Sequence, residues 1–112
     1  MENTITIDEF KKLDLRVGTI VGATRVPDAD KLIELSVDLG EGVPRTIVSG
    51  IATYISDPAT LVGMQCTFVA NMALRKLRGL ESRGMLLAAS TEEGTFAFLT
   101  PSVPLPPGTK LK

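Results

Sequence analysis

Apolar and polar residues alternate along much of the first half of the chain. The clearest run covers residues 33–39, where every second side chain is apolar. A period of two is typical of a strand with one buried face. Residues 13–23 begin with the same alternation and predict a neighbouring strand, with a bend or bulge at Gly18 or Gly22. Branched side chains at Thr46, Ile47 and Val48 predict a third strand over residues 45–49. Residues 40–44 form a turn of hairpin length, which pairs the second and third strands antiparallel.

The second half predicts further short strands and little helix. Apolar, branched segments at residues 64–70, 84–90 and 95–99 read as strands. Thr6 and Glu9 form a capping box that opens a short helix over residues 7–13, and Asp57 before Pro58 opens another that ends near Gly63. About five short strands, with a brief helix between the third and the fourth, predict an all-β, five-stranded Greek-key barrel of the oligonucleotide-binding (OB) type. Another small half-barrel fits the pattern as well.

The chain length favours one domain. With 112 residues, of which 44% are hydrophobic and 22% charged, the chain can build a single core, so we expect one domain over residues 1–112. No apolar run approaches the roughly 20 residues of a membrane-spanning helix, and the N-terminus carries acids where a secretory signal would be basic. These features predict a cytoplasmic protein without a membrane partner.

Residue counts exclude most common catalytic sites. The chain has no His and one Cys, so it has no Ser-His-Asp triad, no zinc finger and no internal disulfide. Gly-rich phosphate loops are absent, Asp28 and Asp30 fit a turn better than a cation site, and Cys66 sits in an apolar strand where it acts as a small hydrophobe. We therefore expect no enzyme activity, no cofactor and no metal.

Charge is distributed unevenly along the chain. The net charge is −1, but residues 1–63 hold six basic and ten acidic side chains, whereas residues 64–112 hold six and three. Most of the excess positive charge of the second half lies in residues 71–85, which contain Arg75, Lys76, Arg78 and Arg83 but only one acidic residue, Glu81. Such a segment binds phosphate, or it is simply a solvated basic loop. With no Trp, one Tyr and four Phe, a base-stacking platform is not expected, which favours folded RNA over single strands.

Four segments in order resemble a known family. Residues 27–32 (PDADKL), 37–40 (VDLG), 45–50 (RTIVSG) and 71–85 closely resemble the tRNA-binding domain appended to methionyl-tRNA synthetases and found in free-standing bacterial tRNA-binding proteins. The similarity runs from about Phe10 to Ser90. The resemblance implies an OB-fold barrel that binds tRNA without catalysis, either free-standing or as an accessory, beta-type subunit of methionyl-tRNA synthetase.

The resemblance also implies which residues contact RNA. The RNA-contacting pattern of the family falls on five residues of the basic segment: Asn71, Lys76, Arg78, Ser82 and Met85. Lys31 matches a family position near the same face. Arg75 and Arg83 add accessory positive charge to the expected tRNA-binding site.

Partners follow from the same resemblance and from apolar residues near both ends of the chain. Relatives of this kind are usually homodimers. We expect the N-terminal helix and the proline-rich segment 101–112, through Val103, Leu105 and Leu111, to form the dimer surface. A methionyl-tRNA synthetase catalytic subunit is a further expected partner. The alternative is a dimeric, peptide-binding export chaperone similar to the CsaA type, which shares this fold.

Overall fold

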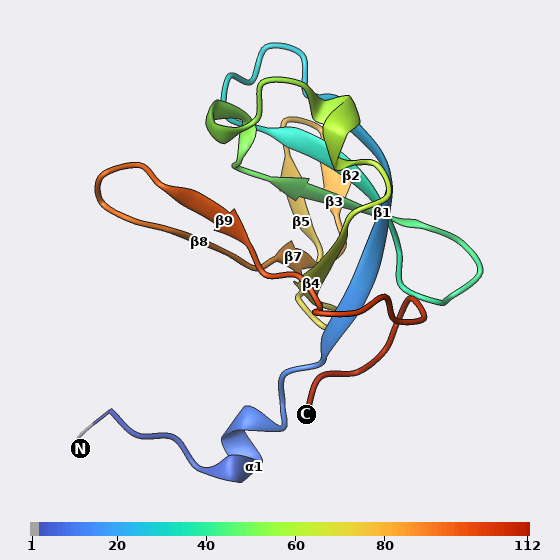
Figure 1. The fold of residues 1–112 in the computed structure, drawn as a ribbon, viewed down its shortest axis with the longest axis vertical. Coiled ribbons are helices and arrows are strands. Elements are labelled where there is room, and N and C mark those ends of the chain that lie inside the picture. Colours follow the sequence, from blue (N-terminus) through green and yellow to red (C-terminus); the bar gives the residue numbers. More distant parts are fainter. Residues whose placement is uncertain (1–2) are drawn as a thin grey trace.

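A five-stranded antiparallel sheet forms the body of the molecule. The computed structural model describes residues 3–112, and its main sheet has the strand order β3-β2-β1-β4-β7, curled into a nearly closed barrel (Figure 1). Its strands are β1 (Leu15–Arg25), β2 (Ile33–Asp38), β3 (Arg45–Ser49), β4 (Gln65–Val69) and β7 (Met85–Leu86). The predicted all-β OB-type barrel is confirmed.

The alternating pattern of β2 fills the interior of the barrel. Its burial alternates without a break, with Ile33, Leu35 and Val37 fully buried and the residues between them half-buried. Because successive side chains of a strand point to opposite faces, the polar set lies on the outer surface of the barrel. The core continues through Phe68 and Ile47, both 0% exposed. The predicted strand at 33–39 is therefore confirmed to within one residue.

Glycines allow β1 to cross the core and pair with strands on both sides of it. A Cβ atom added to Gly18 would come within 2.7 Å of Val37 and 2.8 Å of Phe68, so only glycine fits where the strand crosses the core. The register with β2 shifts between Ile20 and Gly22, which is the predicted irregularity. The strand therefore pairs with β4 over its first half and with β2 over its second.

In the part of the chain that the structure describes, three short helical elements lie outside the sheet. The 3-10 helices η1 (Ala52–Tyr54) and η2 (Pro58–Leu61) connect β3 to β4, and the Asp57 carboxylate caps η2 by accepting from the Ala59 amide, as predicted. Helix α1 (Ile7–Phe10) carries the predicted capping box but ends three residues before the expected limit. None of its residues is buried, so no tertiary packing extends it.

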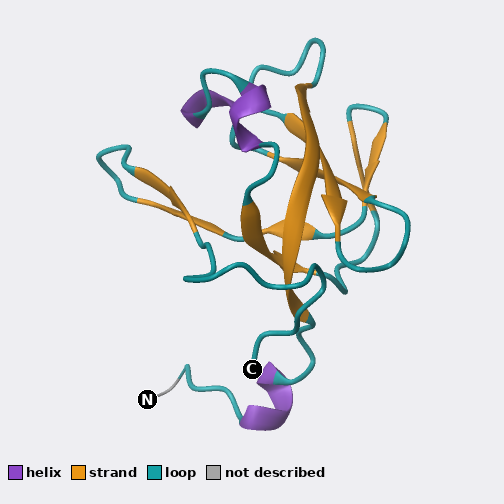
Figure 2. Ribbon diagram, turned by 45° about the vertical axis from the view of Figure 1, so that its right-hand side comes forward, coloured by secondary structure: helices purple, strands orange, loops and turns teal. Residues whose placement is uncertain are grey.

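The predicted strand over residues 84–90 divides into two. Only β7 belongs to the barrel, whereas β8 (Ala88–Ser90) pairs with β9 (Phe96–Phe98) in a hairpin that projects from the body (Figure 2). The Leu87 amide donates to the Thr67 carbonyl at 3.0 Å, which marks the point where the chain leaves the barrel. The ring of Phe96 stacks on Tyr54 at 4.5 Å and secures the hairpin.

The C-terminal segment is extended and runs along β1. The Val17 amide donates to Thr109 at 2.8 Å, and the Leu111 amide donates to Leu15 at 2.9 Å. Val103 is exposed, while Leu105 and Leu111 are half-buried against their own chain. The segment therefore completes the edge of β1, and only part of its apolar surface is available to a partner. Residues 1 and 2 of the predicted domain lie outside the described residues.

No helix within residues 3–112 has the length and apolar character needed to cross a membrane.

Candidate nucleic-acid interface

The basic segment forms a hairpin. Strands β5 (Arg75–Leu77) and β6 (Leu80–Ser82) pair antiparallel, with Arg75 opposite Ser82 and Leu77 opposite Leu80. Arg78 and Gly79 make the turn with φ values of 52° and 82°, and positive φ at both central residues is what a type I′ hairpin turn requires. The sequence predicted only a connection between strands here, and the structure shows a regular two-stranded ribbon.

Three cations of the hairpin are directed to solvent. Arg75, Lys76 and Arg78 are all exposed, and none makes an ion pair or a side-chain hydrogen bond with any residue in 3–112. Glu81 lies opposite Lys76 in the hairpin register without an ion pair between them. The predicted cations therefore stand together on one ribbon and are free to bind an external anion.

Apolar packing fixes the hairpin on the barrel. Leu77 and Leu80 lie against a small cluster of buried residues made by Val26, Ala29 and Val48, separate from the main core. The Arg83 amide also donates to the Thr46 carbonyl at 2.9 Å, which attaches the end of the hairpin to β3 and helps to close the barrel. The cations are thus held on a rigid support rather than on a mobile loop.

Ser82 lies inside this attachment. Its side chain is 0% exposed; its hydroxyl accepts from the Val48 amide at 2.9 Å and donates to the Gly84 carbonyl at 3.3 Å. A buried hydroxyl with both bonds satisfied cannot touch RNA in this conformation. The structure therefore assigns the expected contact residue Ser82 to positioning the hairpin.

Asn71 is engaged in a different structural contact. Its amide oxygen accepts from the Asp14 main-chain amide at 2.9 Å, and its amide nitrogen donates to the Lys12 carbonyl at 2.6 Å. These two bonds tie the segment after α1 to the end of β4. The residue is exposed at the surface, but its side-chain polar groups already have partners within the chain.

The last two predicted residues lie on neighbouring elements. Met85 is half-buried in β7, opposite Val69 of β4. Lys31 is exposed in the loop between β1 and β2, next to Leu32, which packs on the same small cluster as the hairpin leucines. In OB folds the outer face of the second and third strands, the loop between the first two and the insertion between the fourth and fifth bind oligonucleotides. Lys31 and the hairpin occupy these two connections.

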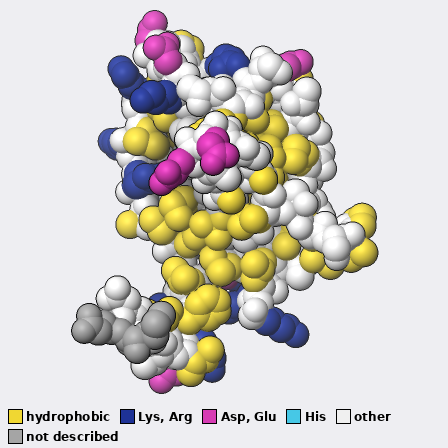
Figure 3. All heavy atoms as spheres, turned by 60° about the vertical axis from the view of Figure 1, so that its left-hand side comes forward, with side chains coloured by type: hydrophobic (Ala, Val, Ile, Leu, Met, Phe, Trp, Pro, Cys, Tyr) yellow, Lys and Arg dark blue, Asp and Glu magenta, His cyan; other side chains and the backbone are white. Residues whose placement is uncertain are grey.

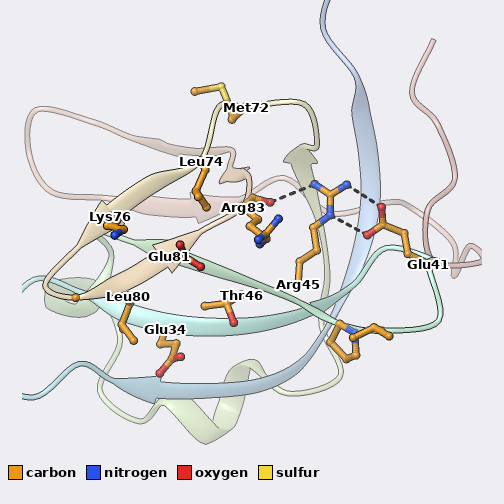
Figure 4. Close-up of a pocket in the computed structure, with 13 residues that line it drawn as sticks. Glu34, Glu41, Arg45, Thr46, Met72, Leu74, Lys76, Leu80, Glu81 and Arg83 are labelled. Atoms are coloured by element: carbon orange, nitrogen blue, oxygen red, sulfur yellow. Dashed lines mark hydrogen bonds and ion pairs between the residues drawn. The ribbon is translucent and has the colours of Figure 1, made fainter.

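A groove of about 940 Å³ runs between the hairpin and the outer face of β2 and β3 (Figure 4). Its floor includes Glu34 and Thr46 of the two strands. The remaining lining comes from the hairpin with its flanking segments and from the loop between β2 and β3, and comprises Glu41, Val43, Pro44, Arg45, Met72, Leu74, Lys76, Gly79, Leu80, Glu81 and Arg83. Local sequence patterns do not reveal this groove, because its walls come from two separate parts of the chain, residues 34–46 and residues 72–83.

Arg45 organises one end of the groove. Its guanidinium makes two hydrogen bonds to the Glu41 carboxylate, at 2.8 and 2.7 Å, and one to the Arg83 carbonyl (Figure 4). It also donates to the Ala70 carbonyl. The hydrogen bonds from Arg45 hold the pKa of Glu41 below its ordinary value, and the same bonds raise the pKa of Arg45. The spacing of four residues across a predicted turn was the only sequence signal for this pair.

Two further features bear on reactivity: the single cysteine and the arrangement of possible metal ligands. Burial raises the pKa of the Cys66 thiol to about 11, so at neutral pH it is a protonated, weakly reactive core group. Within residues 3–112, no group of three or more His, Cys, Asp or Glu side chains is arranged to hold a metal ion.

Comparisons with known proteins agree with this geometry. Residues 15–110 match the family described as "Putative tRNA binding domain". The methionine–tRNA ligase of Parabacteroides distasonis is 46% identical over the whole chain, which spans only 16% of that protein's length.

Solved structures match over nearly the full length. The MetRS related protein from Pyrococcus horikoshii has a TM-score of 0.89 and 37% identity, covering 98% of this chain and 99% of that one. The chaperone CsaA from Bacillus anthracis has a TM-score of 0.85 and 31% identity, covering 97% and 99%. In methionine–tRNA ligases, the segment similar to this chain is only a small part of a longer protein. The match over residues 15–110 shows that the chain belongs to the tRNA-binding domain family.

Proposed function

We propose that this chain binds folded tRNA through the β5–β6 hairpin and catalyses no reaction. The observation that carries the proposal is the exposure of Arg75, Lys76 and Arg78, unpaired within residues 3–112, on a ribbon fixed to the barrel. Lys31 extends the positive surface from the adjacent loop. Cations of this kind position a phosphate backbone without reading sequence, and their small number predicts modest, strongly salt-dependent affinity.

Removing two of these cations tests the proposal. Lys76→Ala combined with Arg78→Ala should abolish retention of total tRNA in a gel shift while leaving the thermal unfolding midpoint nearly unchanged. The matched control is Lys110→Ala with Lys112→Ala, which removes the same charge from the exposed C-terminal segment. Retention by the hairpin variant, or equal loss in the control, would show that tRNA binds elsewhere.

The relatives support a biological setting for this function. We infer that the chain acts in the cytoplasm, either free-standing or as an accessory, beta-type subunit with a methionyl-tRNA synthetase catalytic subunit. The support is the match to one domain of methionine–tRNA ligases and to the MetRS related protein. Co-purification of the chain with such a catalytic subunit, and a gain in aminoacylation when the chain is added, distinguish the subunit role from independent action.

A homodimer would present two such hairpins on one body. Ile5, Ile7 and Leu13 of the N-terminal segment are 63%, 65% and 44% exposed, and hydrophobic side chains occupy the lower part of Figure 3, where this segment lies. Exposed apolar residues of this kind need a covering surface. We therefore assign the N-terminal segment, with Val103 of the C-terminal segment, to the dimer interface.

The oligomeric state can be measured directly. Sedimentation velocity at micromolar concentration should give a dimer for the unmodified chain and a monomer for Ile7→Asp. The control Val62→Asp changes an apolar residue that is 51% exposed next to η2 and should leave the dimer intact. A monomeric unmodified chain refutes this assignment.

Peptide binding is a second candidate function. The groove contains exposed apolar side chains, with Val43 at 74%, Leu74 at 47% and Met72 at 37% exposure, and the CsaA chaperone structure is similar over 97% of the chain. Apolar contacts persist in high salt, whereas phosphate contacts weaken. Binding of an unfolded peptide that is unchanged between low and high salt would support this function over tRNA binding.

A further inference from the structure

The charges in the groove suit a nucleobase better than a phosphate. Three carboxylates and three cations line it, so their formal charges cancel: Glu34, Glu41, Glu81, Arg45, Lys76 and Arg83. A phosphate entering this space would meet as many anions as cations. Nucleobases are neutral and carry amino and imino N–H donors, which carboxylates accept. The balance of charge therefore favours a base inside the groove and phosphates at its rim.

Glu34 is the carboxylate best placed to accept such donors. Its side chain lies half-buried on the outer face of β2, and no hydrogen bond or ion pair joins its carboxylate to any residue in 3–112. Glu41 differs, because both of its carboxylate oxygens bind Arg45. Glu81 differs as well, because it is exposed and lies opposite Lys76. A partly desolvated, unpaired acceptor on a rigid strand is suited to recognising a fixed pair of donors.

Apolar side chains stand beside this acceptor. Glu34 lies opposite Val48 across the strand pair, and Leu80 packs on the cluster that contains Val48, so a leucine of the hairpin lies next to the carboxylate (Figure 4). Leu74 adds a second apolar surface farther along the same wall. Bases taken out of a stack are held between apolar or aromatic side chains, and the groove volume of about 940 Å³ falls within the range of small-ligand sites.

We propose that the groove binds one unpaired guanine of the RNA, with Glu34 accepting hydrogen bonds from its Watson–Crick edge. Guanine presents two adjacent donors there, N1–H and the N2 amino group, which match the two oxygens of a carboxylate. Adenine and cytosine present one amino group next to an acceptor nitrogen, and uracil presents one N–H between two carbonyls. Leu80 and Leu74 contact the ring, while Lys76 and Arg83 contact the flanking phosphates. This inference rests on the proposed function.

A bulged RNA stem isolates the base contact. Fluorescence anisotropy at fixed salt compares stems that carry one bulged guanine, inosine or uracil with a fully paired stem. The guanine bulge should bind about tenfold more tightly than the uracil bulge, as expected for a bidentate base contact. Inosine lacks the N2 amino group and should fall between them. Single-stranded bulges are accessible to proteins in a way that paired bases are not.

Glu34→Gln separates base recognition from general attraction to RNA. The substitution should remove the preference for guanine over uracil, while affinity for the paired stem should stay the same or rise, because a negative charge is lost near a polyanion. The control Glu92→Gln, exposed in the turn between β8 and β9, makes the same charge change outside the groove and should keep the preference. A preference for guanine over uracil that persists in Glu34→Gln would overturn the assignment of Glu34.

The outcomes also separate this inference from the proposed function. Equal affinity for all bulges in the unmodified chain overturns the guanine site, even if Lys76→Ala with Arg78→Ala still abolishes binding of the paired stem. Unchanged binding of the paired stem by that double variant overturns the proposed function instead. A third outcome combines two results: the chain shows no preference among bulges, and an unfolded peptide displaces the guanine-bulged stem. This outcome would overturn the guanine site and assign the groove to peptides.

Discussion

The hydroxyl of Ser82 accepts a hydrogen bond from the Val48 amide at 2.9 Å inside the junction between hairpin and barrel. Ser82→Ala removes the acceptor and leaves a buried N–H without a partner, which should lower the free energy of unfolding by about 1–3 kcal/mol. Urea denaturation measures this loss. Affinity for tRNA, measured where the variant is fully folded, should change little. Lost tRNA affinity with unchanged stability would instead indicate direct contact between Ser82 and RNA.

Arg78 offers a way to remove charge without disturbing the hairpin. Its φ of 52° is costly for most residues, and Asn followed by Gly is the preferred pair for a type I′ turn. Arg78→Asn should therefore keep or slightly raise the unfolding free energy. It should also reduce the slope of log affinity for tRNA against log salt by about one, the value expected for one lost phosphate contact.

A matched variant in the same turn controls for backbone effects. Gly79→Asn keeps every cation but places a side chain at a φ of 82°, where the added Cβ would meet no atom within 4 Å. It should leave the salt slope unchanged. An unchanged slope in Arg78→Asn would show that this arginine makes no phosphate contact.

The sequence predicted those parts of the fold that depend on local pattern. The strand at 33–39 was predicted from the alternation of Ile33, Leu35 and Val37, and the strand at 45–49 from its branched side chains, and each signal lies within one segment. The division of residues 84–90 was not, because it arises where the chain stops pairing with β4 and begins to pair with β9, which no pattern within the segment reports. The sequence also predicted only a connection where the β5–β6 hairpin lies. A type I′ turn needs a positive φ at Arg78, which is not expected of arginine, so the residue types gave no signal for the turn.

The sequence predicted the cations of the candidate site, but not the structural roles of its uncharged polar residues. Arg75, Lys76 and Arg78 are exposed, as a phosphate-binding segment requires. Asn and Ser side chains bind main-chain groups and phosphate equally well, so their type could not reveal that Asn71 and Ser82 are engaged within the chain. The groove with Glu34 depends on the approach of two elements distant in sequence, which no local pattern reports.

Gly108 and Gly40 form a close crossing between the C-terminal segment and the loop after β2. A Cβ atom on Gly108 would lie 2.3 Å from the Leu39 carbonyl oxygen, and φ there is +90°. Gly108→Ala should therefore lower the free energy of unfolding by about 2 kcal/mol more than backbone strain alone would. The reference is Gly42→Ala, with a φ of +85° and no neighbour within 4 Å, which should cost about 1 kcal/mol. Equal midpoints in urea for both variants would contradict the crossing.

The Arg45–Glu41 pair makes stability depend on pH in a defined direction. Hydrogen bonds from Arg45 lower the pKa of Glu41 in the folded chain from the ordinary value of 4.5. A carboxylate of this kind stabilises the fold fully above about pH 4.5 and loses that contribution as pH falls through its lower folded-state pKa. Glu41 is 44% exposed at its side chain, so solvent screening limits the contribution to about 1 kcal/mol or less.

Glu41→Gln tests this direction. At pH 7 the variant should be less stable than the unmodified chain, and at pH 3 the difference in unfolding free energy should shrink, because the unmodified Glu41 is then losing its charge as well. Urea denaturation at both pH values measures the two differences. Glu93→Gln, in the turn between β8 and β9, serves as the control for a general change in charge. A difference that is the same at both pH values would show that Arg45 is held by its bonds to the Ala70 and Arg83 carbonyls rather than by Glu41.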